Sequence, residues 1–241
     1  MDVLSHISLL PYNSFKIDVK SRWFVEYASE EELMEFLKED RFKENRFFHL
    51  GGGCNVLFMN NFEGIILHSG IKGIALIGED ENCVYYRVGA GEVWDDFVRF
   101  AVEKNISGIE NLSAIPGEVG ATPIQNIGAY GVEVKDVISQ VHTIEIKTGK
   151  KRVFSNEECA FGYRDSIFKQ ALKGQYIVTY VVYRLQKRAE YSLHYGNLST
   201  EVKKYGSLTL KNIRKAVMAI RAEKLPDTAT VGNAGSFFMN P

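Results

Sequence analysis

Apolar side chains recur with helical spacing in three parts of the chain. Ser29 and Glu32 form a capping-box pattern, and Leu33, Phe36 and Leu37 follow on one face, which predicts a short helix. Two longer helices, each with one apolar stripe, are also predicted. The stripe of the first is Trp94, Phe97, Val98, Ala101 and Val102. The stripe of the second, near the C-terminus, is Ile213, Ala216, Val217 and Ile220.

Strand patterns lie between these helices. Short runs rich in β-branched and aromatic residues predict strands at residues 47–50, 56–58, 84–88 and 176–185. Residues 141–146 alternate in polarity, and Thr148 and Gly149 supply turn chemistry before 153–154, which predicts a β-hairpin. The order indicates an α+β protein with strands in the majority, and residues 192–206 are the expected connection to a following region.

Composition and charge exclude several classes of partner. Lys and Arg number 29 and Asp and Glu 30, which gives a formal net charge of -1 without a dense basic run, so nucleic acid is not expected. No apolar run reaches the roughly 18 residues of a membrane span. Asp2 and His6 stand where a secretory leader carries cations, and Pro11 ends the apolar residues 7–10. We therefore expect a cytoplasmic protein without membrane insertion.

The cysteines are Cys54, Cys83 and Cys159, an odd set without C-x-x-C spacing. This argues against a disulfide framework and against a zinc site, so we expect reduced thiols and no metal.

Three consecutive glycines stand in the segment 51–55. Such a backbone adopts positive φ readily and turns several N–H groups toward one anion, for example a diphosphate. A tight turn between strands explains a glycine triplet equally well. The strand expected at 56–58 distinguishes this segment from the Rossmann fingerprint, in which the glycines lead into a helix. No cationic neighbour in sequence activates Cys54 as a nucleophile.

A second glycine-rich segment, residues 115–131, holds four glycines and a single charge. This composition allows the main chain to lie against a flat apolar ligand. Thr122, Gln125 and Asn126 offer donors and acceptors suited to the edge of an isoalloxazine ring. A buried loop between domains is the alternative interpretation.

This second segment resembles the P-G-x-V-G-x-x-P-I-Q-N-I-G-A-Y-G motif of the UDP-N-acetylenolpyruvoylglucosamine reductase family. Two other motifs of that family precede this segment: P-Y-N-S-F at 11–15, with Ser14 for a common Thr, and G-x-G-S-N-V-L-F at 51–58, with Cys54 for the usual Ser. Four more come after it: F-G-Y-R-D-S at 161–166, Y-G-N-L at 195–198, K-L-P-D at 224–227 and G-N-A-G-S-F-F-M-N-P at 232–241. In the last of these, Met239 stands for a common Lys. The resemblance covers essentially the whole chain.

The resemblance implies a vanillyl-alcohol-oxidase/PCMH-type FAD-binding fold in two subdomains, residues 1–70 and 71–200. Residues 201–241 are then the N-terminal part of an α+β substrate-binding domain. Family members continue for several tens of residues and carry a catalytic glutamate there, so we expect this domain to be truncated.

FAD, bound non-covalently, and NADPH as reductant are the cofactors that the resemblance implies. The expected FAD contacts are Gly51, Gly52, Gly53, Cys54, Asn55 and Val56 in the first segment, and Ile115, Pro116, Gly117, Gly120, Ala121, Thr122, Gln125, Asn126, Gly128, Ala129, Tyr130 and Gly131 in the second.

The same resemblance assigns residues to the reduction of UDP-N-acetylglucosamine enolpyruvate to UDP-N-acetylmuramate, a step in peptidoglycan precursor synthesis. Arg164 is expected beside the flavin and the enolpyruvyl group, and Ser236 is expected to donate the proton. Tyr195 and Lys224 are expected at the UDP diphosphate, with an amide contact from Asn240. On its own, Ser236 is also a small residue in a glycine-rich turn, and Arg164 is also an ion-pair partner for Asp165.

Two alternatives remain open at the level of sequence. A flavin oxidase of the same superfamily would carry a covalent flavin anchor, and residues 115–131 contain neither His nor Cys. A catalytically impaired FAD-binding fragment or paralogue would bind cofactor without turnover. Oxidation of NADPH in the presence of the enolpyruvyl substrate separates these cases.

Overall fold

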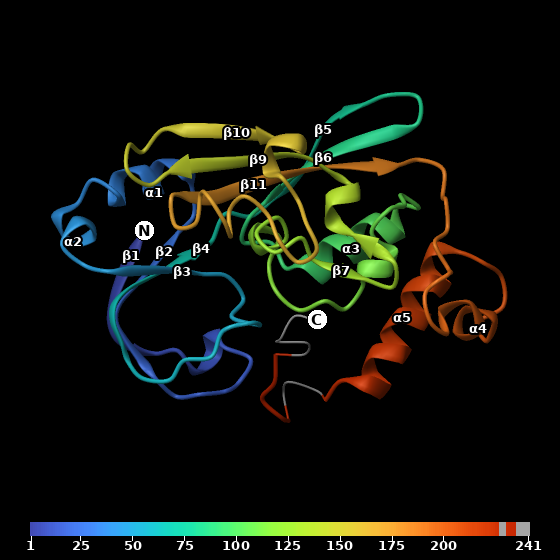
Figure 1. Cartoon of the computed structure of the whole chain (residues 1–241), viewed down its shortest axis with the longest axis horizontal. Helices are drawn as coiled ribbons and strands as arrows, with labels where there is room; N and C mark the ends of the chain where they lie inside the picture. The colour runs from blue at the N-terminus through green and yellow to red at the C-terminus, as the bar shows by residue number, and fades with distance from the viewer. Residues whose placement is uncertain (227–229, 235–241) are drawn as a thin grey trace.

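The computed structural model describes residues 1–226 and 230–234. Its helices are α1 (Glu30–Phe36), α2 (Asp40–Lys43), α3 (Trp94–Glu103), α4 (Leu198–Lys203) and α5 (Leu210–Lys224) (Figure 1). Its strands are β1 (Asp2–Ser8), β2 (Lys20–Tyr27), β3 (Phe47–Leu50), β4 (Phe62–Ser69), β5 (Ile74–Glu79), β6 (Cys83–Gly89), β7 (Gly128–Ala129), β8 (Val132–Glu133), β9 (Ile138–Glu145), β10 (Lys151–Ser155) and β11 (Tyr176–Gln186).

The N-terminal sheet has the strand order β1-β2-β4-β3, with β2 and β3 parallel to β4 and β1 antiparallel to β2. Three consecutive residues of its inner strand, Ile65, Ile66 and Leu67, are fully buried. A continuous apolar run of this kind is expected where both faces of a strand are covered. One face packs against Leu33 and Phe36 of α1 and Phe42 of α2, and the other is covered by loops.

The second sheet is antiparallel throughout, in the order β10-β9-β11-β6-β5. Helix α3 covers one face of it, and the five residues of the predicted stripe are all buried. The predicted hairpin is confirmed as β9 and β10, and the long predicted strand is β11.

The two sheets share part of one core. Ile144 of β9 and Ile177 of β11 are buried among Val25, Ile65 and Leu67 of the N-terminal sheet. Side chains from different sheets in one cluster fix the relative position of the sheets, because well-packed interiors resist sliding. Segments that follow β3 and β6 are therefore brought to a common boundary.

Helices α4 and α5 pack on each other at the far end of the second sheet (Figure 1). The predicted stripe of α5 is buried, and Thr209 caps its N-terminus by accepting a hydrogen bond from the amide of Asn212. The guanidinium of Arg214 binds both oxygens of Asp95 in α3, at 2.6 and 2.7 Å. Such a bidentate pair ties α5 to the second sheet. The segment 192–206 is thus more than a connection, since it contains α4.

The α+β prediction is confirmed, and so are the predicted helices at α1, α3 and α5. The strand predicted at 56–58 is wrong, because these residues form a loop without ladder partners between β3 and β4. Phe58 is nevertheless buried against Phe24 and Ile66, which explains the apolar pattern there. The subdomain boundaries at residues 70 and 200 stay a prediction.

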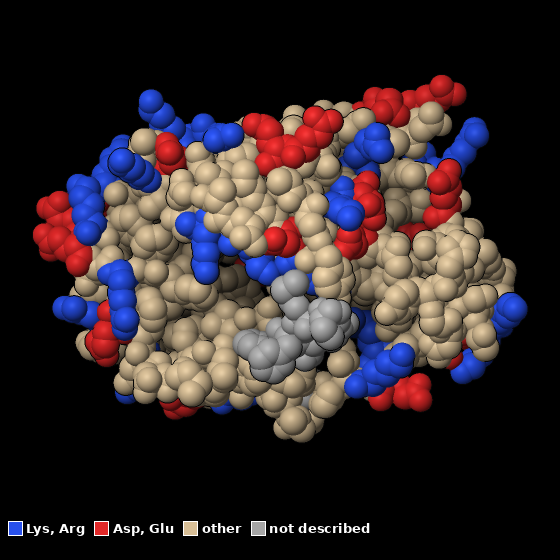
Figure 2. Space-filling view, in the orientation of Figure 1, with Lys and Arg blue, Asp and Glu red and all other residues tan. Residues whose placement is uncertain are grey.

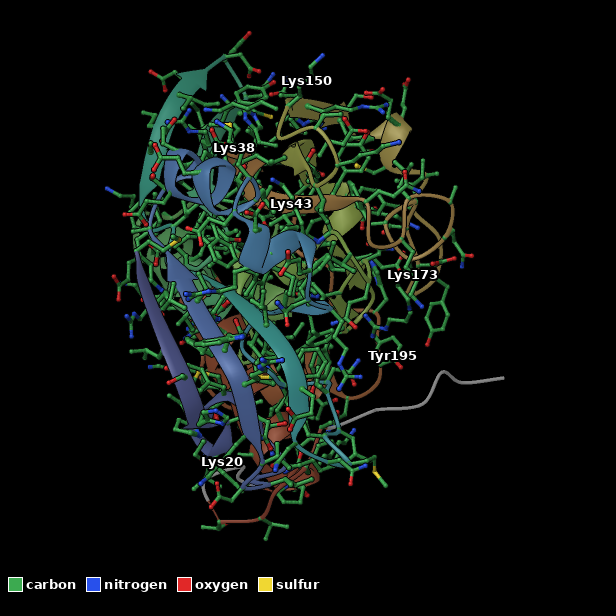
Figure 3. The ribbon with its side chains drawn as sticks, turned by 90° about the vertical axis from the view of Figure 1, so that its left-hand side faces the viewer. Lys20, Lys38, Lys43, Lys150, Lys173 and Tyr195 are labelled. Atoms are coloured by element: carbon green, nitrogen blue, oxygen red, sulfur yellow. The ribbon has the colours of Figure 1, made fainter. Side chains whose placement is uncertain are left out.

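Lysines on the side of the N-terminal sheet lie apart from one another. Figure 3 shows Lys20 near the bottom of this side, Lys150 at the top, and Lys38 and Lys43 a short way below Lys150. Positive charge is therefore dispersed over this side. In the described part of the chain, the helices are too short or too polar to traverse a bilayer.

Candidate functional site

The glycine segment 51–55 forms a tight loop directly after β3. Of its three glycines only Gly53 has positive φ, at +62°. A side chain at Gly53 would place its Cβ 1.9 Å from the carbonyl oxygen of Tyr12, so the loop is braced from behind by residues 12–14. The amide of Ser14 donates to Gly53 at 3.1 Å, and Asn13 holds this brace through hydrogen bonds to Leu9 and Ile17.

The front of this loop presents unpaired backbone donors. The amide N–H groups of Gly52, Gly53, Cys54 and Asn55 have no acceptor among residues 1–226 and 230–234. Several adjacent N–H groups without a protein acceptor form a site suited to an anion. Burial raises the pKa of the Cys54 thiol, and its Sγ donates to the carbonyl of Gly52 at 3.2 Å. Cys54 is therefore a poor nucleophile, as its sequence context predicts.

The segment 115–131 starts against the loop that follows β6. The amides of Val119 and Gly120 donate to the carbonyls of Glu92 and Ala90, and the amide of Trp94 donates to Gly117. A Cβ at Gly120 would lie 2.8 Å from that of Ala90, so the close contact requires glycine there. Gly117 has φ of +122°, and a Cβ placed on it would have no atom within 4 Å, so this side of Gly117 faces open space.

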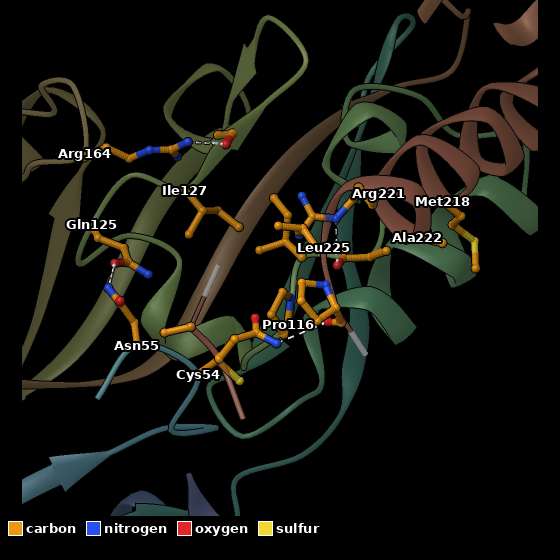
Figure 4. Close-up of a pocket in the computed structure, with 16 residues that line it drawn as sticks. Cys54, Asn55, Pro116, Gln125, Ile127, Arg164, Met218, Arg221, Ala222 and Leu225 are labelled. Atoms are coloured by element: carbon orange, nitrogen blue, oxygen red, sulfur yellow. Dashed lines mark hydrogen bonds between the residues drawn. The ribbon is translucent and has the colours of Figure 1, made fainter. Parts of the chain in front are cut away.

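The two glycine segments meet at the boundary between the sheets. A Cβ on Gly52 would lie 3.1 Å from Cα of Gly117, and the side-chain amide of Asn55 donates to Oε1 of Gln125 at 3.2 Å. Figure 4 shows this amide pair, with the dashed line between the two side chains. Backbone from each sheet therefore contributes to one wall.

Two cavities lie along this wall, of about 620 Å³ and about 450 Å³. They share Cys54, Asn55, Pro116 and Gln125, which makes them two ends of one groove. Figure 2 shows that the face of the molecule is hollowed near its middle. Each volume is typical of a small-molecule site, and a groove with two ends suits an elongated ligand such as a dinucleotide.

The smaller end of the groove, which we call the glycine end, is lined by the first glycine segment, by residues 116–118 and by apolar side chains of β11 and its neighbours, including Phe168, Ile177 and Val178. It holds a flat apolar slot beside free amides. The larger end, which we call the arginine end, is lined by Ile115, Ile127, Gly128 and Arg164, by Met218, Arg221 and Ala222 of α5, and by Leu225 directly after that helix.

Arg164 is held in place by the second glycine segment. Its Nη2 donates to the carbonyl of Gly128 at 2.5 Å and its Nη1 to that of Asn126 at 3.5 Å, as Figure 4 shows for Gly128. The ion pair with Asp165 is not formed, because that carboxylate accepts from the amide of Ser166 and from the side chain of Gln170. Arg164 thus presents its positive charge to the arginine end of the groove.

Strained backbone gathers around this end. Ala114, Asn126, Tyr130 and Arg164 have positive φ, at 57°, 41°, 49° and 53°. Apart from Asn, such residues enter the left-handed region only at a cost, and conformations of this kind concentrate at functional sites.

Arg221 is a site residue that the motif comparison did not identify. Its Nε donates to the carbonyl of Ala114 at 3.1 Å, and its pKa is lowered, chiefly by burial. The side chain points toward the groove in Figure 4. The sequence offers one indication of this residue. Arg221 follows Ile220 at the border of the apolar stripe of α5, where a cationic side chain lies partly against the core.

Several predicted cofactor residues turn their side chains away from the groove. The buried hydroxyl of Thr122 donates to Val119 and lies 2.7 Å from that of Tyr183. The buried side chain of Asn126 donates to Gly162 and accepts from the amide of Lys135. Both side chains hold the loop in shape. Their contact with FAD stays a prediction, as does that of the nearby Ala129, Tyr130 and Gly131, which do not line either cavity in the described structure.

The predicted substrate residues lie at the margin. Tyr195 is 60% exposed, with its ring edge-on to that of Tyr130 at 6.2 Å, and Lys224 is exposed at the end of α5. Neither is among the described residues that line the groove. Ser236 and Asn240 lie outside the described residues, although Asn233 and Ala234, shortly before them, line the arginine end. The described residues contain no group of three or more potential metal ligands.

Residues 22–155 match the FAD binding domain family. The chain is 51% identical over 234 residues to the UDP-N-acetylenolpyruvoylglucosamine reductase of Bacteroides fragilis, covering 97% of this chain and 70% of that protein. It is 47% identical over 242 residues to the protein of that name from Porphyromonas gingivalis, covering 100% of this chain and 72% of that one.

Solved structures resemble this one at lower identity. The UDP-N-acetylenolpyruvylglucosamine reductase of Thermus caldophilus matches with a TM-score of 0.75 and 24% identity, covering 100% of this chain and 76% of that one. A p-cresol methylhydroxylase with substrate bound matches with a TM-score of 0.51 and 16% identity, covering 73% of this chain and 38% of that one. These likenesses concern the fold alone, and they confirm the predicted FAD-binding fold.

Substitution of Gly53 by Ala tests the close packing behind the glycine loop. Gly149, in the β9–β10 turn, has a similar φ of +67° but nothing within 4 Å, so Gly149→Ala is the matched control for backbone strain alone. We expect Gly149→Ala to lower the free energy of unfolding by about 1–2 kcal/mol. Gly53→Ala should cost more and should also weaken FAD binding, because it displaces the loop from residues 12–14. Chemical denaturation and FAD titration measure both effects, and equal losses of stability with unchanged FAD affinity would refute this view.

Proposed function

Because the chain belongs to the UDP-N-acetylenolpyruvoylglucosamine reductase family, we propose that it reduces UDP-N-acetylglucosamine enolpyruvate to UDP-N-acetylmuramate with FAD and NADPH, in peptidoglycan precursor synthesis. The observation that carries the proposal is the meeting of Arg164, Arg221 and the second glycine segment at one end of the groove.

The groove fits FAD in shape and in donors. The unpaired amides of Gly52, Gly53, Cys54 and Asn55 hold the diphosphate, and the slot beside Ile177 and Val178 accepts the adenine. Ile115, Pro116 and Ile127 form the apolar wall for the isoalloxazine at the arginine end. Bound FAD supplies the hydride that passes from NADPH to the enolpyruvyl ether.

Two guanidinium groups serve the reacting end of the substrate. Hydride addition to an enol ether leaves negative charge beside the carboxylate, and preorganised cations stabilise that charge. Arg164 is fixed by Gly128 and Asn126, and Arg221 is fixed through Nε by Ala114, so neither needs to reorganise during the reaction. The terminal nitrogens of Arg221 have no acceptor within the described residues and remain available for a carboxylate.

Apolar side chains lie around these cations. Ile127 lies between Arg164 and Arg221 in Figure 4, and Met218 of α5 and Leu225 just after it line the same end of the groove. A less polar surrounding strengthens the interaction of the guanidinium groups with developing charge.

Proton delivery and substrate anchoring are assigned by motif. Ser236 is the proposed proton donor, supported by the position of Asn233 and Ala234 at the arginine end. A serine hydroxyl is a weak acid, so it needs a donor-rich pocket or a relay behind it. Tyr195, Lys224 and Asn240 are proposed contacts of the UDP diphosphate, with a charge-assisted bond from Lys224.

We expect the flavin to be bound without a covalent bond. Cys54 is the cysteine of the described residues that lines the groove, and its raised pKa makes the thiolate needed for attack scarce. Acid precipitation of the yellow protein should therefore release all flavin into the supernatant, for wild type and for Cys54→Ser alike. Flavin that stays on the wild-type pellet and leaves the Cys54→Ser pellet would establish a covalent anchor instead.

Arg164→Ala tests the catalytic assignment. We expect it to slow reoxidation of the reduced flavin by the enolpyruvyl substrate by roughly 10²-fold, the typical effect of losing one preorganised stabilising group. Reduction by NADPH should change far less, and the flavin content of the purified protein should remain unchanged. Rapid mixing measures each half-reaction separately.

The matched control is Arg99→Ala, because Arg99 is exposed on α3 and pairs with Asp96, and neither residue lines the groove. It should leave both half-reactions unaltered. Equal losses in the two half-reactions of Arg164→Ala, or loss of flavin from that variant, would show that Arg164 shapes the fold or the cofactor site and does not act on the substrate.

A further inference from the structure

A cluster of ionisable side chains lies beneath the glycine end of the groove. It joins Glu26 of β2, His49 of β3 and His68 of β4 with Glu118 of the second glycine segment. His49 and Glu118 line the groove. The side chains of His68 and Glu118 are only 12% and 13% exposed, so their charges are poorly hydrated.

Hydrogen bonding sets the orientation of His68. Its Nδ1 lies 3.0 Å from the carbonyl oxygen of Leu50, which only accepts, so Nδ1 carries a hydrogen. The other ring nitrogen, Nε2, faces Oε1 of Glu118 at 3.6 Å and Oε2 of Glu26 at 3.8 Å. A proton on Glu118 therefore faces Nε2, the ring nitrogen that is not bonded to Leu50.

The surroundings of Glu118 favour its protonated form near neutral pH. Burial raises the pKa of Glu118 to about 7; the ammonium of Lys72 opposes this rise and the carboxylate of Glu26 adds to it. Lys72 also donates to the carbonyl of Gly91, so its charge stays close by.

The remaining groups of the cluster are uncharged. Burial lowers the pKa of His49 to about 4, with a smaller effect of His68, and the His49 ring bonds to the hydroxyl of Tyr27 at 2.6 Å. Burial raises the pKa values of Tyr27 and Cys54. The charges that act on Glu118 are therefore those of Lys72 and Glu26.

Glu118 stands directly against the loop that holds the proposed diphosphate. Its Oε2 would lie 3.5 Å from a Cβ placed on Gly51. A carboxylate at this place repels a doubly charged diphosphate in a partly buried site, whereas a protonated Glu118 does not.

We propose that Glu118, which faces His68, must carry a proton when the FAD diphosphate binds, so that FAD binding takes up a proton. This rests on the proposed place of FAD in the groove. The affinity for FAD is constant while Glu118 is protonated, and it falls as rising pH removes that proton. A single proton changes the dissociation constant by at most about tenfold per pH unit.

The first experiment uses the wild-type chain freed of flavin. Titration calorimetry with FAD at pH 7.5, in buffers of different ionisation enthalpy, counts the protons exchanged on binding. We expect an uptake of between zero and one proton, and a dissociation constant that rises between pH 7 and pH 9. Zero exchange or proton release would overturn the proposal. Failure of FAD to bind at any pH would contradict the place of the cofactor itself.

The second experiment uses two isosteric variants. Glu118→Gln removes the carboxyl that takes up the proton, and its FAD affinity should be independent of pH over the same range, with no proton uptake. Glu26→Gln removes the exposed carboxylate on the other side of His68. It should keep the full pH dependence, with the midpoint moved to slightly lower pH because Glu26 adds to the rise at Glu118. If Glu118→Gln retained the wild-type pH profile, a different group would be the source of the proton.

Discussion

The close approach of two glycine segments is the constraint on which the rest of the structure depends. Gly52, after β3, and Gly117, after β6, come so near that a Cβ on Gly52 would lie 3.1 Å from Cα of Gly117. Neither sheet places its segment there alone. The shared core, with Ile144 and Ile177 among the side chains of the N-terminal sheet, fixes the two sheets and so brings the segments together. The wall of the groove is the result.

Because of this constraint, the two ends of the groove present different chemical groups. At the glycine end the main chain provides the donors, since the amides of 52–55 have no other acceptor in the described structure. At the arginine end side chains provide the charge, and each guanidinium is held by the carbonyl of a residue with positive φ, Asn126 for Arg164 and Ala114 for Arg221. Helix α5 takes part because Arg214 anchors it to Asp95, whose Oδ1 also accepts from the amide of Ala114.

Periodic patterns predicted most of the architecture. Helices α3 and α5 and the hairpin of β9 and β10 are long enough for one buried face to be unambiguous in the sequence. The wrong strand at 56–58 has a physical cause: Phe58 is buried by the loop it belongs to, and burial without a hydrogen-bonded ladder leaves the same apolar signature as a strand.

The site was predictable where it consists of main chain and less so where it consists of side chains. Glycine runs identify both segments directly. The orientation of Thr122 depends on Tyr183, and that of Asn126 on Gly162, and such partners far along the chain leave no local pattern. Arg221 was missed for the same reason. Glu118 and His68 are fifty residues apart in sequence and meet only because the glycine segments do.

Amide hydrogen exchange of the wild-type chain with and without FAD tests the central claim most directly. The amides of Gly52, Gly53, Cys54 and Asn55 have no protein acceptor among the described residues and should exchange rapidly in the free protein. If they hold the diphosphate, saturating FAD slows their exchange, together with that of the adjoining residues 115–118. If FAD binds and these amides continue to exchange at the same rate while another surface becomes protected, the groove between the glycine segments is not the cofactor site.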